Sequence, residues 1–198
     1  MPTQPTPLIL ASNSPRRREL LSQSGYLFEV APADDAVEAA IAVTPNIRDY
    51  PLVLAEAKAR AICSRFRDGV VLAADTIAIC NDEILGKPRD RQDAERMLRL
   101  LSGREHEVLT AVVLIDCHCG AELAHLETTR LLMDQLSDAD LQAYLNSQLW
   151  QGKAGAFGYQ DGWDWLHVVA GSESNVVGLP LERLSELFAS LEQKSRQA

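Results

Sequence analysis

Hydrophobic residues occur along the chain in short runs that have the composition of buried strands. Each run is rich in valine, isoleucine, leucine or alanine and is bounded by turn-forming residues, which is the pattern of a strand. The runs cover residues 8–11, 28–31, 70–80, 107–117, 122–135 and 165–170. Residues 107–135 predict a hairpin or meander, and the pair Asn81 and Asp82 predicts the turn that ends the long run at 70–80.

Helical patterns separate these runs. In residues 51–66 the apolar positions follow helical spacing, which predicts a helix. Further helices are predicted after the N-cap residues Ser14, Asp90 and Ser137 and over the amphipathic residues 181–193. Residues 33–46 predict a loop with partial helix, and residues 153–162 a loop. The alternation predicts an α/β fold, with a mixed β-sheet flanked by helices and two lobes around a central cleft.

Length and charge narrow the function classes. The chain has 198 residues and no internal repeat or linker-like segment, so we expect a single domain over residues 1–198 with an ordered core from about 8 to 192. Lys and Arg total 19 against 28 Asp and Glu, a formal net charge of −9. This balance excludes a simple basic nucleic-acid surface, because such a surface must neutralise many phosphates. It leaves room for a small anion held by a few local cations.

The cysteines and the apolar segments suggest where the chain resides. The four cysteines, Cys63, Cys80, Cys117 and Cys119, include no CxxC pair and do not predict a disulfide-dense framework. The segment 117–119, Cys-His-Cys, is the only cluster of metal-ligand type, and its place between two strands favours a plain hairpin edge. No apolar stretch is long enough to span a bilayer, and the polar N-terminus lacks signal-peptide features. We therefore expect a reduced, cytoplasmic setting without membrane contact.

Two arginines lie at an unusual position. Arg16 and Arg17 occupy the second and third positions of the helix predicted after Ser14. Cations are mildly unfavourable there, because the free N–H groups already present partial positive charge. A bound anion would reverse this cost, and the hydroxyls of Ser12 and Ser14 would complete a phosphate cradle. The alternative is a solvated arginine pair on a surface helix.

Asp75 interrupts an otherwise apolar strand. A buried carboxylate is costly unless it is paired, protonated or bound to a cation, so Asp75 is a candidate metal ligand or general base. The alternative is an exposed aspartate at a strand end or bulge. Lys58 lies on the apolar side of its predicted helix, where most lysines extend their ammonium to solvent. Lys87 follows Gly86 on a constrained loop after the strand. No Walker, dinucleotide-binding, HExxH or GxSxG motif is present.

Several collinear segments resemble the Maf family of nucleoside triphosphate pyrophosphatases. The segment 11–21, ASNSPRRRELL, resembles the opening signature of that family. Further similar segments are Leu54 to Ala59, Ala74-Asp75-Thr76, Gly86-Lys87-Pro88, Leu101-Ser102-Gly103 with His106 and Thr110, the segment 153–158 with Gln160, and the segment 177–181. They run in order from residue 8 to about residue 190, and a series of this length is far more specific than any one motif.

The resemblance implies an elongated α/β fold with a central cleft and metal-dependent hydrolysis of a nucleoside triphosphate to the monophosphate and pyrophosphate. It implies that Asp75 is the proton acceptor that activates water. It further implies phosphate contacts by Ser12, Arg16, Arg17, Lys58 and Lys87. Arg16, Thr76 and Gln160 resemble the specificity residues of the branch that acts on dTTP and UTP. The expected partner of the chain is therefore a nucleoside triphosphate.

The expected cofactor is a divalent cation, Mg²⁺ or Mn²⁺, held by Asp75 and an acidic residue of the segment after the second strand. Spacing to Lys58 favours Glu38 as that residue, with Asp35 as the alternative. The segment Trp163-Asp164-Trp165 departs from the Gly-rich turn typical of the family, so it leaves base specificity less well defined than reaction type.

Other functions remain open at this point. The substrate could be 7-methyl-GTP or another modified nucleotide, or the chain could be a non-catalytic nucleotide-binding regulator of cell division. Turnover with release of pyrophosphate, and its dependence on the base, distinguishes these alternatives. The apolar residues 131–133 fit either a core strand or a self-association surface that would make a homodimer.

Overall fold

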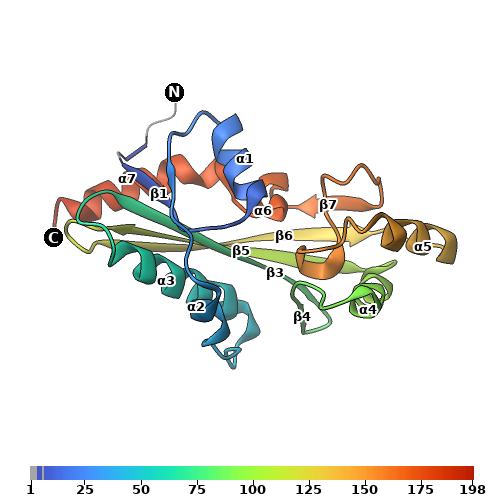
Figure 1. The fold of residues 1–198 in the computed structure, drawn as a ribbon. Coiled ribbons are helices and arrows are strands. Elements are labelled where there is room, and N and C mark those ends of the chain that lie inside the picture. The colour runs from blue at the N-terminus through green and yellow to red at the C-terminus, as the bar shows by residue number, and fades with distance from the viewer. Residues whose placement is uncertain (1–3, 6) are drawn as a thin grey trace. The chain divides into compact units, whose positions relative to one another are not determined.

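The computed structural model describes residues 4, 5 and 7–198, which form a mixed sheet with helices packed on it (Figure 1). The strands are β1 (Leu8–Leu10), β2 (Glu29–Val30), β3 (Val70–Cys80), β4 (Glu83–Leu85), β5 (Glu105–Asp116), β6 (Glu122–Met133) and β7 (Leu166–Ala170). Their order is β2-β1-β3-β5-β6-β7, and β4 pairs with β3. Strand β1 runs parallel to β2 and β3, whereas the β3–β4 and β6–β7 pairs are antiparallel. The predicted α/β fold with a mixed sheet is confirmed.

The helices follow the sequence pattern except for α6 (Glu173–Val177), which the pattern did not predict. They are α1 (Pro15–Gln23), α2 (Asp35–Ala39), α3 (Tyr50–Cys63), α4 (Arg91–Leu101), α5 (Asp138–Ser147), α6 (Glu173–Val177) and α7 (Leu181–Ser195), with short 3-10 turns at Ile47–Asp49 and Ala154–Ala156. Ser14, Asp90 and Ser137 cap their helices, each accepting a hydrogen bond from a first-turn backbone N–H. Among the described residues, no helix combines the length and apolar character needed to cross a bilayer.

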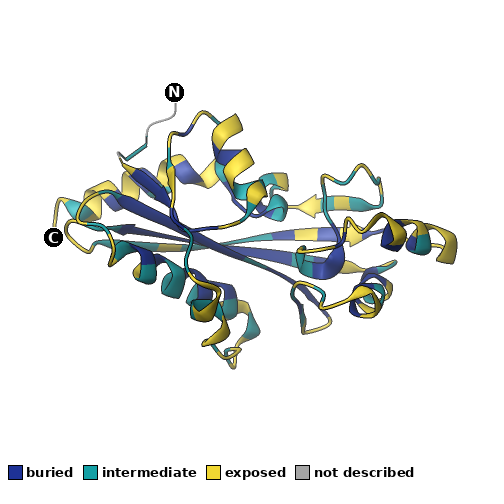
Figure 2. Ribbon diagram, in the orientation of Figure 1, coloured by how far each residue is buried: buried dark blue, intermediate teal, exposed yellow. Residues whose placement is uncertain are grey.

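The described chain forms two compact units. The first comprises Met1–Asp75, Thr110–Glu127 and Gly178–Ala198, and the second comprises Thr76–Leu109 and Thr128–Val177. The expectation of a single domain stays a prediction. Figure 2 shows that the buried positions follow the strands, whereas the helices turn exposed positions outward. Leu131 and Met133 are buried and only Leu132 is exposed, so this segment is a core strand, as one of its two interpretations predicted.

The core of the first unit explains how its polar residues are placed. Buried residues of β1, β3 and β5, among them Ile9, Val71 and Val113, pack against Ala55 and Ala59 of α3. Helix α7 lies on the opposite face of these strands (Figure 1). Because β1 and β3 are parallel, their carboxyl ends meet at one edge of the sheet, where open α/β sheets bind ligands. Ser12 follows β1 at this edge, and Asp75 lies beyond the β3 residues that pair with β1.

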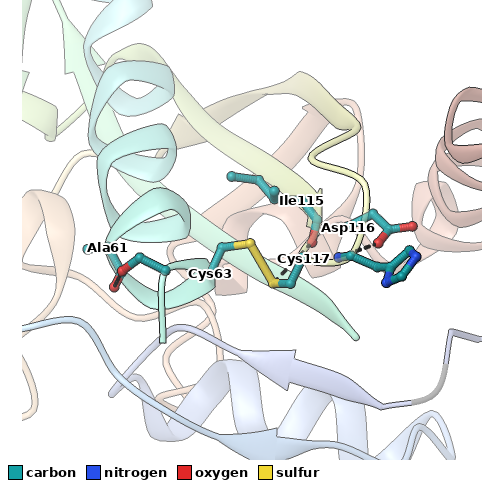
Figure 3. Close-up of a disulfide and its surroundings, with 7 residues drawn as sticks. Ala61, Cys63, Ile115, Asp116 and Cys117 are labelled. Carbon is teal, nitrogen blue, oxygen red and sulfur yellow. Dashed lines mark hydrogen bonds between the residues drawn. A yellow bond between two sulfur atoms is a disulfide. The ribbon is translucent and has the colours of Figure 1, made fainter. Parts of the chain in front are cut away.

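A disulfide connects Cys63, at the end of α3, to Cys117, just after β5 (Figure 3). The two residues are separated by 54 positions in sequence, and their Cα atoms lie 5.4 Å apart. Cys80 and Cys119 are free thiols, the first buried and the second exposed. The interpretation of residues 117–119 as a hairpin edge rather than a metal site agrees with this pairing, because Cys117 is occupied by Cys63.

Reduction of this disulfide is expected to lower the free energy of unfolding by about 4 kcal/mol, because the bond closes a loop of 54 residues in the unfolded chain. Urea unfolding with and without a dithiol reductant measures the change, and Cys63→Ser should match the reduced wild type. Cys119→Ser is the control, since Cys119 is exposed and unpaired with another cysteine. Equal stability of the oxidised and reduced protein would contradict the prediction.

Candidate functional site

Lys58 lies between two carboxylates in the first unit. Its Nζ is 2.5 Å from Oδ1 of Asp75 and 2.9 Å from Oε2 of Glu38. The side chains of Lys58 and Asp75 are 14% and 11% exposed, whereas that of Glu38 is 42% exposed. Exposure to water therefore increases across the cluster. The carboxylate of Asp75 on β3 and the ammonium of Lys58 are largely buried, whereas the carboxylate of Glu38 is open to water.

The helix that carries Lys58 explains its direction. Leu54, Ala55 and Ile62 form the buried face of α3 and fix the helix against the sheet. Lys58 lies one turn from both Leu54 and Ile62 and therefore points along the same side of the helix. Most such lysines extend their ammonium to bulk water. That of Lys58 does not, because Asp75 of the adjacent strand supplies a charge partner.

The start of α1 forms a second part of this site. The Ser12 hydroxyl accepts hydrogen bonds from the backbone N–H of Ser14 (3.2 Å) and from the guanidinium of Arg17 (3.1 Å). A hydroxyl oxygen has two acceptor positions and one O–H donor. With both acceptor positions engaged, the O–H of Ser12 is left as a donor, and an anionic oxygen would suit it as an acceptor.

Arg17 is held on two sides by the protein. Its Nε donates to the carbonyl of Gly178 at 2.7 Å, and its NH1 group donates to Ser12. Desolvation lowers the pKa of Arg17, while the carboxylates of Asp75 and Glu38 act in the opposite direction and the nearby Arg16 adds to the lowering. These electrostatic couplings bring the arginine pair and the Asp75 cluster into one charged site. Arg17 positions Ser12 there, and its own contact with substrate stays a prediction.

Tyr50 also belongs to this site and was not among the residues predicted for it. It is the first residue of α3, and its hydroxyl donates to the carbonyl of Ile41 at 3.4 Å. Burial raises the pKa of Tyr50, and the negative charges of Glu38 and Asp75 raise it further, against the effect of Lys58. A signal was present in the sequence: Tyr50, Leu54 and Lys58 are spaced by four residues and so share one helix face.

The remaining predicted site residues belong to the second unit. Thr76 follows Asp75 on β3 and is partly buried. Lys87 is exposed on the loop after the β3–β4 hairpin, and Gln160 is exposed on the turn after the Ala154–Ala156 segment. The backbone N–H of Gly155 donates to the carbonyl of Gly86 at 3.1 Å, so the turn that carries Gln160 is tied to the loop that carries Lys87.

The donor set suits a hard divalent cation. Within the described part of the chain, no three His, Cys, Asp or Glu side chains come together as a metal cage. Asp75 and Glu38 nevertheless supply oxygen atoms on either side of one ammonium. Mg²⁺ is commonly bound by one or two carboxylates together with substrate phosphates and water rather than by an all-protein cage. Of the two acidic residues considered, Glu38 is the one paired with Lys58.

Comparisons with known proteins show the family to which the chain is similar. The chain matches the family model described as Maf-like protein over residues 7–191. It is 51% identical to a dTTP/UTP pyrophosphatase of Rhodopirellula baltica, over 98% of this chain and 86% of the relative. It is 41% identical to a dTTP/UTP pyrophosphatase of Ruminiclostridium cellulolyticum, over 94% of this chain and 97% of the relative.

A solved structure supports the fold assignment. A HAM1 protein from Coxiella burnetii aligns with a TM-score of 0.52 at 16% identity, covering 92% of this chain and 98% of that chain. At this identity the likeness concerns the fold alone. The family model spans most of the chain and the relatives match it nearly end to end, and we conclude that the chain belongs to the Maf family.

Proposed function

We propose that this chain is a nucleoside triphosphate pyrophosphatase that hydrolyses dTTP and UTP to the nucleoside monophosphate and pyrophosphate. The names of the relatives at 51% and 41% identity support the substrate and the reaction. The observation that carries the proposal is the buried Asp75 carboxylate, which is paired with Lys58 and electrostatically coupled to Arg17. A carboxylate beside a group of cations suits proton abstraction next to a bound polyphosphate.

In this mechanism Asp75 is the general base. It accepts a proton from the water that attacks the α-phosphorus of the substrate. The bond between that phosphorus and the oxygen bridging to the β-phosphorus breaks, and its electron pair leaves with pyrophosphate. Lys58, Arg16 and Lys87 stabilise the charge that develops on the leaving group. Ser12 donates its O–H to a phosphate oxygen, and Arg17 holds Ser12 in that orientation.

Asp75 and Glu38 would hold the divalent cation, Mg²⁺ or Mn²⁺. When bound, such an ion supplies a Lewis acid that neutralises phosphate charge. Lys58 competes with it for the same carboxylates, so substrate phosphates that draw the ammonium away would free oxygen atoms for the metal. The carboxylates of Asp75 and Glu38 would then hold the cation in place of the ammonium of Lys58.

The base of the nucleotide is read by Gln160 and Thr76. The amide of Gln160 carries both a donor and an acceptor, which suits the edge of uracil or thymine. Thr76 is small and leaves room for the base or a thymine methyl group. Arg16 completes the specificity set from the start of α1.

A substrate panel tests the proposal. Purified protein is incubated with Mg²⁺ or Mn²⁺ and dTTP, UTP, dCTP, dATP, dGTP or 7-methyl-GTP, and pyrophosphate and orthophosphate are measured separately. We expect pyrophosphate as the phosphate product, with dTTP and UTP turned over fastest. Binding without turnover would support the regulator alternative instead, and preference for 7-methyl-GTP would support the modified-nucleotide alternative.

Gln160→Ala is expected to lower the ratio of kcat/KM for dTTP to that for dCTP by about tenfold, because a site built to hydrogen-bond the base loses its discriminating group. The kcat for dTTP should change less than this ratio. Gln151→Ala is the matched control, since Gln151 is an exposed glutamine of the same unit. An unaltered ratio in Gln160→Ala would assign base selectivity to other residues.

A further inference from the structure

A buried ion pair fixes the turn that carries Gln160. The carboxylate of Asp161 accepts hydrogen bonds from the hydroxyl of Tyr144 (2.6 Å) and from the backbone N–H of Gly158 (3.2 Å), and it pairs with the ammonium of Lys153. The side chains of Lys153 and Asp161 are 13% and 9% exposed, and Tyr144 is fully buried. A charge removed from water in this way is costly unless all its partners are in place, so the three contacts hold the turn in one conformation.

Gly158 shows how closely the turn wraps around this pair. A Cβ atom at Gly158 would lie 2.5 Å from Oδ1 of Asp161 and 2.6 Å from Nζ of Lys153. Any side chain at this position would push the two charges apart. The ion pair therefore lies directly against the main chain of the turn.

Gln160 differs from its two sequence neighbours in the hydrogen bonds that its side chain makes. Asp161 is held as described, and the hydroxyl of Tyr159 donates to Glu173 of α6 at 2.8 Å. The side chain of Gln160 is exposed and makes no hydrogen bond to the rest of the described chain. The main chain is thus held on both sides of Gln160, while the Gln160 amide makes no hydrogen bond to the described chain. We expect this arrangement of a residue that recognises a ligand.

An aromatic cluster of the second unit lies next to the turn in sequence. Tyr144 packs on Phe157 with ring centroids 4.9 Å apart, and Trp163 and Trp165 pack on each other at 4.5 Å. Both tryptophans also contact Tyr144, at 5.9 Å and 6.0 Å. These tryptophans follow the turn in sequence and pack on Tyr144, whose hydroxyl donates to Asp161.

We infer that Asp161 is a positioning residue for base selectivity, acting through Gln160. Its contacts with Tyr144, Lys153 and Gly158 fix the peptide that follows Gln160 and so set where the Gln160 amide points. The inference rests on the proposed function, in which Gln160 reads the pyrimidine. It makes the specificity of this site depend on a charge pair that does not touch the substrate.

A double-mutant cycle with dTTP and dCTP tests the inference. Asp161→Asn is expected to lower the ratio of the two kcat/KM values by about tenfold, because a small displacement of a recognition group costs this much or more. The same substitution made in a Gln160→Ala background should change the ratio no further, since it acts through Gln160. A merely structural role would lower activity on both nucleotides equally and would do so in both backgrounds.

Two other variants keep the test decisive. Tyr144→Phe removes one hydrogen bond but keeps the ion pair, and a smaller decrease in the same ratio is expected even if Asp161→Asn fails to fold. Asp164→Asn is the matched control, because Asp164 is an exposed aspartate of the same loop. An unchanged ratio in both Asp161→Asn and Tyr144→Phe, with a lowered ratio in Gln160→Ala, would overturn this inference alone. An unchanged ratio in Gln160→Ala, or a wild type that releases no pyrophosphate, would overturn the proposed roles as well.

Discussion

Asp75→Asn is expected to reduce kcat for dTTP by roughly 10²–10⁴-fold, the usual contribution of a general base. Asparagine has nearly the shape of aspartate and can keep a contact with Lys58, but it cannot accept the proton from water. Because the ammonium of Lys58 keeps Glu38 as a partner in the variant, we expect the fold to persist. Rates of pyrophosphate release and equilibrium binding of dTTP measure the two effects separately.

Glu122→Gln is the control for this substitution. Glu122 forms an ion pair with Arg60 of α3, two positions after Lys58, at 3.0 Å. The variant makes the same change of carboxylate to amide at a β6 residue that pairs with α3 but not with Lys58, so it should keep the wild-type kcat. Turnover by Asp75→Asn at the wild-type rate would remove the general base from the mechanism.

Lys58→Met is expected to lower kcat/KM for dTTP by roughly 10²–10³-fold, which is typical for loss of one group that stabilises transition-state charge. The substitution also leaves the carboxylates of Asp75 and Glu38 without the ammonium between them. Two unneutralised carboxylates attract a divalent cation more strongly. We therefore expect Mg²⁺ or Mn²⁺ alone to raise the Tm of Lys58→Met more than that of the wild type.

Arg60→Met is the matched control for Lys58→Met. Arg60 lies on the same helix and pairs with Glu56 and Glu122 rather than with Asp75. The carboxylates of Glu56 and Glu122 are each 29% exposed, against 11% for that of Asp75, so water screens their charge more strongly. Arg60→Met should therefore keep the wild-type kcat/KM and respond to metal less than Lys58→Met does. If Lys58→Met shows no greater response to metal than Arg60→Met, Asp75 and Glu38 are not the metal ligands.

The fold was predictable from sequence where local signals are strong. Strand β3 has the predicted limits, because an apolar run of this length between turns has few alternatives. The missed elements are short: β4 has three residues and α6 has five. The turn before β4 was predicted at Asn81 and Asp82, which both adopt positive φ, yet three residues carry too little periodicity to identify the strand that follows.

The candidate site was predictable where a residue is unusual in its local sequence. Asp75 stands out because it is a charge in an apolar strand, and Arg16 and Arg17 stand out at the start of a helix. The partners of these residues depend on the tertiary fold. Whether Glu38 or Asp35 approaches Lys58 follows from the path of α2, and the Cys63–Cys117 pair joins residues 54 positions apart. The Lys153–Asp161 pair is closer in sequence but depends on the turn at Gly158.

Hydrolysis of dTTP in ¹⁸O-labelled water tests the central chemistry most directly. If Asp75 activates water toward the α-phosphorus, mass spectrometry will find the label in dTMP and none in pyrophosphate. Label in the pyrophosphate, or release of orthophosphate in its place, would mean that the enzyme attacks a different phosphorus and would contradict the account.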